Sequence, residues 1–122
     1  MRRIILWVLI TSWLVLSLPP AVRGQEPMHT LTGQELLQQC TAPKQDPSVV
    51  GTTKLALCMG FLHGFIEGVR SVAPLAICLP PGANIRSITD AFIDWFALRQ
   101  DLWPQPAVEG VRAMLGDLYP CR

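Results

Sequence analysis

The side chains that could carry out acid–base chemistry are few in this 122-residue chain, and they are not grouped. His63 lies four residues before Glu67, so the two side chains could pair along one helix face. His29 lies in a segment without a structural pattern, and Asp90 and Asp94 share an outward helix face. Catalysis needs an acid, a base or a nucleophile held within reach of one another, and a solvated helix face is the simpler interpretation of His63 and Glu67. We therefore predict no catalytic residues and no enzyme activity.

Four cysteines, Cys40, Cys58, Cys78 and Cys121, form the other chemically distinctive set. Structural zinc sites usually have roughly two to four residues between two cysteines, and thioredoxin-like redox motifs need C-x-x-C; neither spacing occurs in this chain. An even number of cysteines in a small exported domain is typical of disulfides. Four cysteines allow three pairings, and the helix pattern described below favours Cys40–Cys58 with Cys78–Cys121. We predict two disulfides, no bound metal and no cofactor.

The first 24 residues have the composition of a secretory signal peptide. Met1-Arg2-Arg3 is basic, the run Ile4–Leu18 is apolar except for three hydroxyl residues, and two prolines follow it. Cleavage is expected after Gly24; the alternative, a membrane anchor, needs about 20 apolar residues, more than this run contains. Removing the leader removes three arginines and no acid, so the mature chain has seven basic and nine acidic side chains. We predict a periplasmic or secreted protein that is free of the membrane after cleavage and binds no nucleic acid.

Apolar residues recur at helical spacing in four segments of residues 32–122, which we take as one domain after a flexible lead at 25–31. The first helix starts at Thr32, where Thr32 and Glu35 form a capping box, and Pro43 is expected to end it. No segment alternates apolar and polar residues, so no sheet is expected. The other helices, separated by proline-containing loops, are expected at about residues 52–72, 84–98 and 108–118. The sequence predicts an all-α fold, a small array of four helices, or of five, braced by two disulfides.

Gly60, Gly64 and Gly68 recur every four residues within the second predicted helix, on nearly the opposite face from its apolar stripe. Each glycine in a helix costs up to about 1 kcal/mol relative to alanine. Three in register therefore predict that another backbone packs closely against this helix. Among the aromatic residues, Trp103 lies beside a proline-rich break and is the candidate for a contact with a protein partner.

Five short motifs follow one another in a characteristic order: Leu36-Leu37-Gln38-Gln39-Cys40, Cys58-Met59-Gly60-Phe61-Leu62-His63-Gly64, Cys78-Leu79-Pro80, Trp95-Phe96 and Tyr119-Pro120-Cys121. In this order they resemble the Rap/Tai immunity family, the resistance-associated and amidase-immunity proteins of type VI secretion. The resemblance covers about residues 31–122. It implies an all-helical periplasmic protein that forms a homodimer, binds a cognate peptidoglycan amidase toxin and blocks its active site. Immunity proteins diversify at their contact surface, so no binding residue of the family is assigned to a position in this chain.

Two functions of different classes fit a small exported helical domain. The resemblance implies an immunity protein that neutralises a secreted peptidoglycan amidase by binding it. The alternative is a small periplasmic acid-stress or general chaperone, which would bind many unfolded proteins. The mature chain has only two histidines, which offers little for a switch near neutral pH. The partner is a protein in both cases. Binding of one enzyme would favour the immunity protein, and binding of many unfolded proteins would favour the chaperone.

Overall fold

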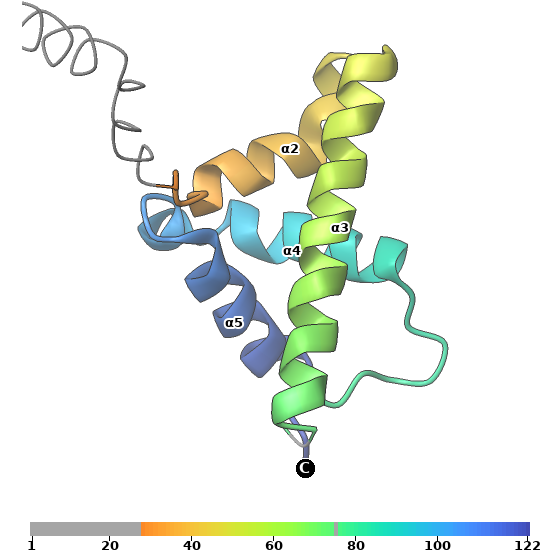
Figure 1. Cartoon of the computed structure of the whole chain (residues 1–122), viewed down its shortest axis with the longest axis vertical. Coiled ribbons are helices and arrows are strands. Elements are labelled where there is room, and N and C mark those ends of the chain that lie inside the picture. The colour runs from red at the N-terminus through yellow and green to blue at the C-terminus, as the bar shows by residue number, and fades with distance from the viewer. Residues whose placement is uncertain (1–27, 75) are drawn as a thin grey trace, which may run out of the picture.

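The computed structural model describes residues 28–74 and 76–122. Within these ranges there is no strand, and the predicted all-α fold with two disulfides is confirmed. The predicted signal peptide, its cleavage after Gly24 and most of the predicted lead lie outside the described residues. The helices, shown in Figure 1, are α2 (Gly33–Gln45), α3 (Val49–Val72), α4 (Ile85–Ala97), the short 3₁₀ helix η1 (Gln100–Leu102) and α5 (Ala107–Leu118).

Helix α2 begins where the capping box predicts. Thr32 Oγ1 accepts the Glu35 N–H at 3.3 Å, and Glu35 Oε2 accepts the Thr32 N–H at 2.8 Å. The prediction that Pro43 ends this helix is wrong, because α2 continues for two residues beyond it. A proline removes one N–H from the helix, but the Asp46 N–H still donates to the Ala42 carbonyl at 2.8 Å and closes the last turn.

The turn between α2 and α3 is tighter than the sequence indicated. Ser48 Oγ accepts the Val50 N–H at 3.2 Å and caps α3, which starts three residues earlier than predicted. A small cap residue of this kind satisfies one of the unpaired N–H groups of the first turn. Gly51 is required by the turn, because a Cβ at this position would collide with the carbonyl oxygen of Asp46.

The hydrophobic core lies between the helices, and α2 and α4 each contact the other three α-helices. Thr89, a buried polar residue in this core, is satisfied because its hydroxyl donates to the Ile85 carbonyl at 2.7 Å. The largest fully buried side chains are those of Phe92, Phe96, Leu36, Leu62, Met114, Leu115, Val111 and Cys58. Since these come from all four α-helices, the domain has one continuous core.

Phe96 occupies a place that two glycines leave free. A Cβ added at Gly33 would lie 2.5 Å from Phe96 Cζ, and a Cβ at Gly110 would also collide with this ring. The ring is itself fully buried and stacks on Phe92 with 4.9 Å between the centroids. Gly33 and Gly110 therefore allow α2 and α5 to approach α4 closely.

The three glycines of α3 have the opposite surroundings. Among the described residues, no atom outside the helix would lie within 4 Å of a Cβ added at Gly60, Gly64 or Gly68. The prediction that a helix of this chain packs against them is wrong. The physical reason is that α3 crosses in front of α4 in Figure 1 and buries its other face, which carries Gly51, Cys58, Leu62 and Ile66.

The start of the domain is held by a segment far along the chain. The Leu31 carbonyl accepts the Ala107 N–H at 2.8 Å, and the Gly33 N–H donates to the Gln105 carbonyl at 2.9 Å. An isolated antiparallel bridge pairs Thr32 with Pro106 between them. Leu31, the last residue of the predicted flexible lead, also packs against the core. The fixed part of the domain therefore begins at Leu31.

The two disulfides have the pairing that the helix pattern favoured. Cys40–Cys58 joins α2 to α3 across a sequence separation of 18, and Cys78–Cys121 joins the segment before α4 to the C-terminus across 43. Loops of these lengths correspond to a stabilisation of about 3 and about 4 kcal/mol in the chain-entropy account. The first bridge is buried, whereas the second lies near the surface, where Cys78 is exposed.

Candidate partner-binding surface

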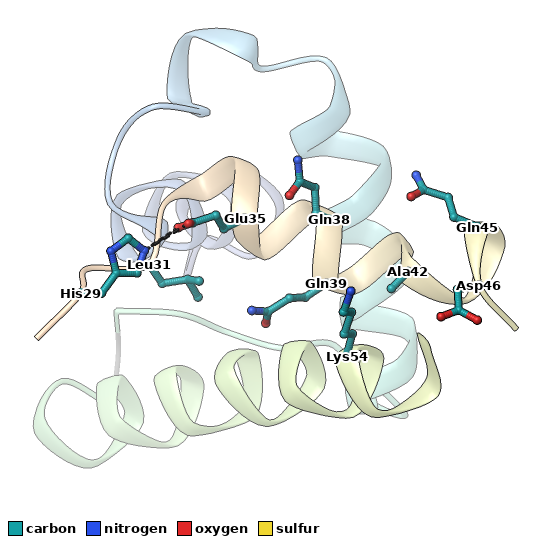
Figure 2. A pocket seen from close by; sticks show the side chains of 9 residues that line it. All are labelled: His29, Leu31, Glu35, Gln38, Gln39, Ala42, Gln45, Asp46 and Lys54. Atoms are coloured by element: carbon teal, nitrogen blue, oxygen red, sulfur yellow. Dashed lines mark hydrogen bonds and ion pairs between the residues drawn. The ribbon is translucent and has the colours of Figure 1, made fainter. Parts of the chain in front are cut away.

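A polar groove with a volume of about 520 Å³ lies along α2 and the start of α3 (Figure 2). Seven of its nine lining residues are polar and contribute glutamine amides, two carboxylates, an imidazole and an ammonium group. Such groups donate and accept many hydrogen bonds, so the groove suits a polar segment of a partner. Its lining residues are His29, Leu31, Glu35, Gln38, Gln39, Ala42, Gln45, Asp46 and Lys54.

The most strongly fixed charge in this groove is Glu35. The His29 Nε2 lies 3.1 and 3.2 Å from its two carboxylate oxygens, and the Thr32 hydroxyl donates to Oε2 at 3.0 Å. The Thr32 N–H, then the His29 ring and the Thr32 hydroxyl, hold the pKa of Glu35 below its ordinary value. Glu35 is thus a stably ionised capping group, and it positions His29 at the end of the groove.

The other end of the groove carries the carboxylate of Asp46. Hydrogen bonds from the Ser48 hydroxyl and the Ser48 N–H lower its pKa, and the positive charge of Lys54 acts in the same direction. The Ser48 N–H lies 3.0 Å from Asp46 Oδ1. Both carboxylates of the groove are therefore ionised at neutral pH. Figure 2 shows Lys54 between them along the groove.

A second, smaller pocket lies where α2, α3 and α4 meet. It has a volume of about 140 Å³. We call it the junction pocket. Three charged side chains, Lys44, Arg86 and Asp90, lie among its lining residues. The remaining lining is mainly apolar and consists of Cys40, Pro43, Leu55, Met59, Thr89 and Ile93.

The titratable residues singled out by sequence are not brought together. His63 is exposed and does not pair with Glu67, which instead lies 3.3 Å from Arg70. Asp94 is also exposed, and Asp90 lies at the junction pocket. In the ranges that the structure covers, no three His, Cys, Asp or Glu side chains form a group that could hold a metal ion.

Trp103, the sequence candidate for a partner contact, is half-buried and has contacts within the chain. Its Nε1 donates to the Phe96 carbonyl at 3.1 Å, and its own carbonyl accepts the Gln34 N–H at 2.9 Å. These bonds hold the segment after α4 against α2. The partner contact of Trp103 stays a prediction. The groove and the junction pocket were missed, because they are formed by residues of different helices whose relative placement the sequence pattern does not give.

The outer face of α3, on the side of its three open glycines, carries large apolar side chains towards the two ends of the helix and exposed polar side chains such as His63 and Glu67 between them. By length and composition, α3 is the one helix in the described ranges that could cross a membrane. Large apolar side chains exposed on α3 are Val49, Val50, Leu57 and Val72, with exposed fractions of 81%, 57%, 58% and 84%. Three of these, Val49, Val50 and Leu57, lie within the first nine residues of α3, and exposed apolar residues grouped in this way mark interaction surfaces.

The chain was compared with protein families, curated proteins and solved structures. The model of the family described as Rap1a immunity proteins matches residues 32–121. No curated protein and no solved structure gives a match. The matched range extends from Thr32, which caps α2, to Cys121, which closes the second disulfide.

Proposed function

This chain belongs to the Rap1a immunity protein family, and we propose that it protects a bacterial cell by binding a peptidoglycan amidase delivered through type VI secretion and blocking its active site. The observation that carries the proposal is the extent of the match, residues 32–121. This range includes every helix that the structure describes and all four cysteines. The relationship therefore applies to the whole disulfide-braced domain.

We propose that the protein acts in the periplasm. Two observations support this localisation. Disulfides persist in oxidising compartments, and the chain forms two of them. The basic and apolar residues at 1–18 have the pattern of a signal peptide. Mass spectrometry of the protein recovered from periplasm should give a chain that starts at Gln25 and contains no free thiol, and a chain that keeps Met1 contradicts the cleavage.

We propose that the toxin is bound by surface complementarity and that this chain performs no catalysis. Two features support a binding role: the polar groove and the junction pocket together offer hydrogen-bonding, charged and apolar contact groups. Non-obligate protein interfaces combine such groups, with apolar residues at the centre and polar residues at the rim.

The test is protection against a toxin. Cells that direct a type VI peptidoglycan amidase to the periplasm should lyse, and co-expression of the full chain should prevent lysis. The purified proteins should form a complex of fixed stoichiometry in which hydrolysis of peptidoglycan is inhibited. Capture of many unfolded proteins with no inhibition of any amidase would instead favour the chaperone function.

We also propose that two copies of the chain associate through the outer face of α3. The proposal is supported by the four large apolar side chains exposed on α3 and by the open space around Gly60 and Gly64. Sedimentation should show a dimer that Leu57→Gln weakens. Leu118→Gln on α5 is the matched control, since Leu118 is also exposed, at 41%, and lies on another helix. Equal sedimentation of native protein and Leu57→Gln would overturn this interface.

A further inference from the structure

The junction pocket has the size and lining of a site for one apolar side chain. Its volume of about 140 Å³ is close to the roughly 150 Å³ of an apolar cavity that holds benzene. Leu55, Met59 and Ile93 are half-buried and line it. The hydroxyl of Thr89 already donates to the Ile85 carbonyl at 2.7 Å, so the interior presents mainly carbon and sulfur atoms.

The pocket is held in shape without a partner. Cys40, one of its lining residues, is bonded to Cys58 by the buried disulfide, which fixes α2 against α3. Helix α4 supplies the third wall and is anchored through the fully buried Phe92 and Phe96. A site on rigid elements loses little conformational entropy when it is filled, so a small occupant is sufficient.

The two cations at the rim of this pocket, Lys44 and Arg86, are exposed to solvent and have no carboxylate partner within the described chain. Arg70, Arg99 and Arg112 each pair with a carboxylate at 3.0 to 3.3 Å. In the same described ranges, Lys44 and Arg86 form no ion pair within 4.0 Å, although Asp90 also lines the pocket. Two cations and one carboxylate leave a positive excess beside an apolar hollow.

The position of Arg86 is unfavourable for its own helix. Arg86 is the second residue of α4, and the first turn of this helix has no acidic residue. Because helix N-termini carry partial positive charge, a cation is disfavoured there. Lys44 differs in this respect, since it lies in the last turn of α2, where a cation is favourable. Arg86 therefore gains no stabilisation from the dipole of its own helix, and its exposed side chain can pair with a group outside the chain.

We propose that the junction pocket binds an apolar side chain of the toxin, of leucine or phenylalanine size, next to a toxin carboxylate that pairs with Arg86 and Lys44. This inference rests on the proposed function, because the occupant is a residue of the neutralised enzyme. It assigns one anchor point of the complex to the meeting place of α2, α3 and α4. The polar groove then contacts a flanking, hydrogen-bonding part of the same partner.

A first experiment tests the pocket without any toxin. The protein recovered oxidised from periplasm is titrated with 4-methylpentanoate and with the uncharged 4-methylpentan-1-ol while methyl signals are followed by NMR. Both compounds should shift the methyl signals of Leu55, Met59 and Ile93, and the acid should bind more tightly. Arg86→Gln should reduce this advantage by about two- to fivefold, the range expected of one exposed charge pair. Shifts confined to other methyl groups, or equal binding of acid and alcohol, overturn the pocket chemistry.

A second experiment uses catalytically inactive variants of type VI amidase toxins and measures dissociation constants by calorimetry. Leu55→Gln and Arg86→Gln should each weaken the complex by about tenfold or more, as anchor residues do. Leu57→Gln on the outer face of α3 and Arg70→Gln are the matched controls and should leave toxin binding within about twofold of the native value. Thermal unfolding of each variant shows whether the fold is kept.

The two experiments separate the inference from the proposed function. If a toxin binds all four variants as tightly as the native chain, the junction pocket is not the anchor, while the immunity function stands. If no amidase toxin binds the native chain, the immunity function is overturned, and so is the proposal that the toxin fills the pocket. The titration with small compounds still decides whether the pocket binds an apolar acid. If the pocket variants instead lose dimer in sedimentation and keep toxin binding, the occupant is a second copy and the inference is wrong.

Discussion

Two groups of helical glycines in this domain have opposite surroundings. Gly33 and Gly110 lie against the buried ring of Phe96, where a Cβ would collide, whereas open space surrounds Gly60, Gly64 and Gly68. All five carry the same backbone entropy cost in a helix, so the difference lies in what faces them. The first group is needed for the chain to fold on itself. The second is not, because no part of the described chain packs against it.

The largest effect should come from removing the ring that the first group accommodates. Phe96→Ala should lower the free energy of unfolding by about 3–5 kcal/mol, because it deletes a fully buried aromatic side chain and leaves a cavity between three helices. Urea denaturation of the oxidised protein measures this loss. A loss below about 1 kcal/mol would mean that α2 and α5 do not depend on this ring.

A smaller but more specific effect is expected at one of the packed glycines. Gly110→Ala should destabilise the domain by about 1–3 kcal/mol, because the added methyl group meets the Phe96 ring. In a Phe96→Leu background the same substitution should cost less, since a shorter side chain gives way, and the two changes should be non-additive. Strict additivity in this double-mutant cycle would contradict the contact.

Alanine substitutions at the open glycines of α3 should stabilise the fold, in contrast to Gly110→Ala. At concentrations where sedimentation shows a monomer, Gly60→Ala and Gly64→Ala should each raise the free energy of unfolding by up to about 1 kcal/mol, because alanine favours the helix and meets no atom. At concentrations where the chain self-associates, the same variants should lose part of this gain. Destabilisation of the monomer would show that a segment of the chain does pack there.

The smallest effect is expected at a surface carboxylate, that of Glu35 in the first turn of α2. The lowered pKa of Glu35 means that its charge stabilises the fold above the ordinary value of 4.5, and this contribution is lost as the pH falls through the lowered pKa. The melting temperature of Glu35→Gln should therefore lie below that of the native chain near neutral pH and approach it in acid. Circular dichroism melts from about pH 7 to about pH 3 measure the difference, and a constant gap at all pH values would contradict the role of the charge.

Much of the fold could be predicted because its signals are local. The Thr32 and Glu35 pair marks the start of α2 through bonds three residues apart, and the apolar stripe of α4 identifies its buried face as Ile88, Phe92 and Phe96. The disulfide pairing followed from the order of the helices. The end of α2 was misplaced, because Pro43 is compatible with a last turn that closes from Asp46 to Ala42.

The site and the packed glycines could not be predicted in the same way. A glycine spacing of four residues places three positions on one helix face, but it does not say whether a neighbour is present there. Gly110 would have been the better indicator of close helix packing. It lies on the buried face of α5 with Ala107, Val111 and Met114, where a residue without a side chain lets a neighbouring helix approach. The junction pocket needs residues from three helices, and only the tertiary arrangement brings these together.

The hydrogen bonds that join Leu31 and Gly33 to Gln105 and Ala107 have a consequence for biogenesis. A chain that leaves the ribosome with its N-terminus first cannot complete this pairing until residue 107 has been synthesised, close to the end of its 122 residues. The nascent polypeptide therefore lacks these closing contacts until the start of α5 has been made. Folding of the domain is completed late, by a pairing between its first helix and its last.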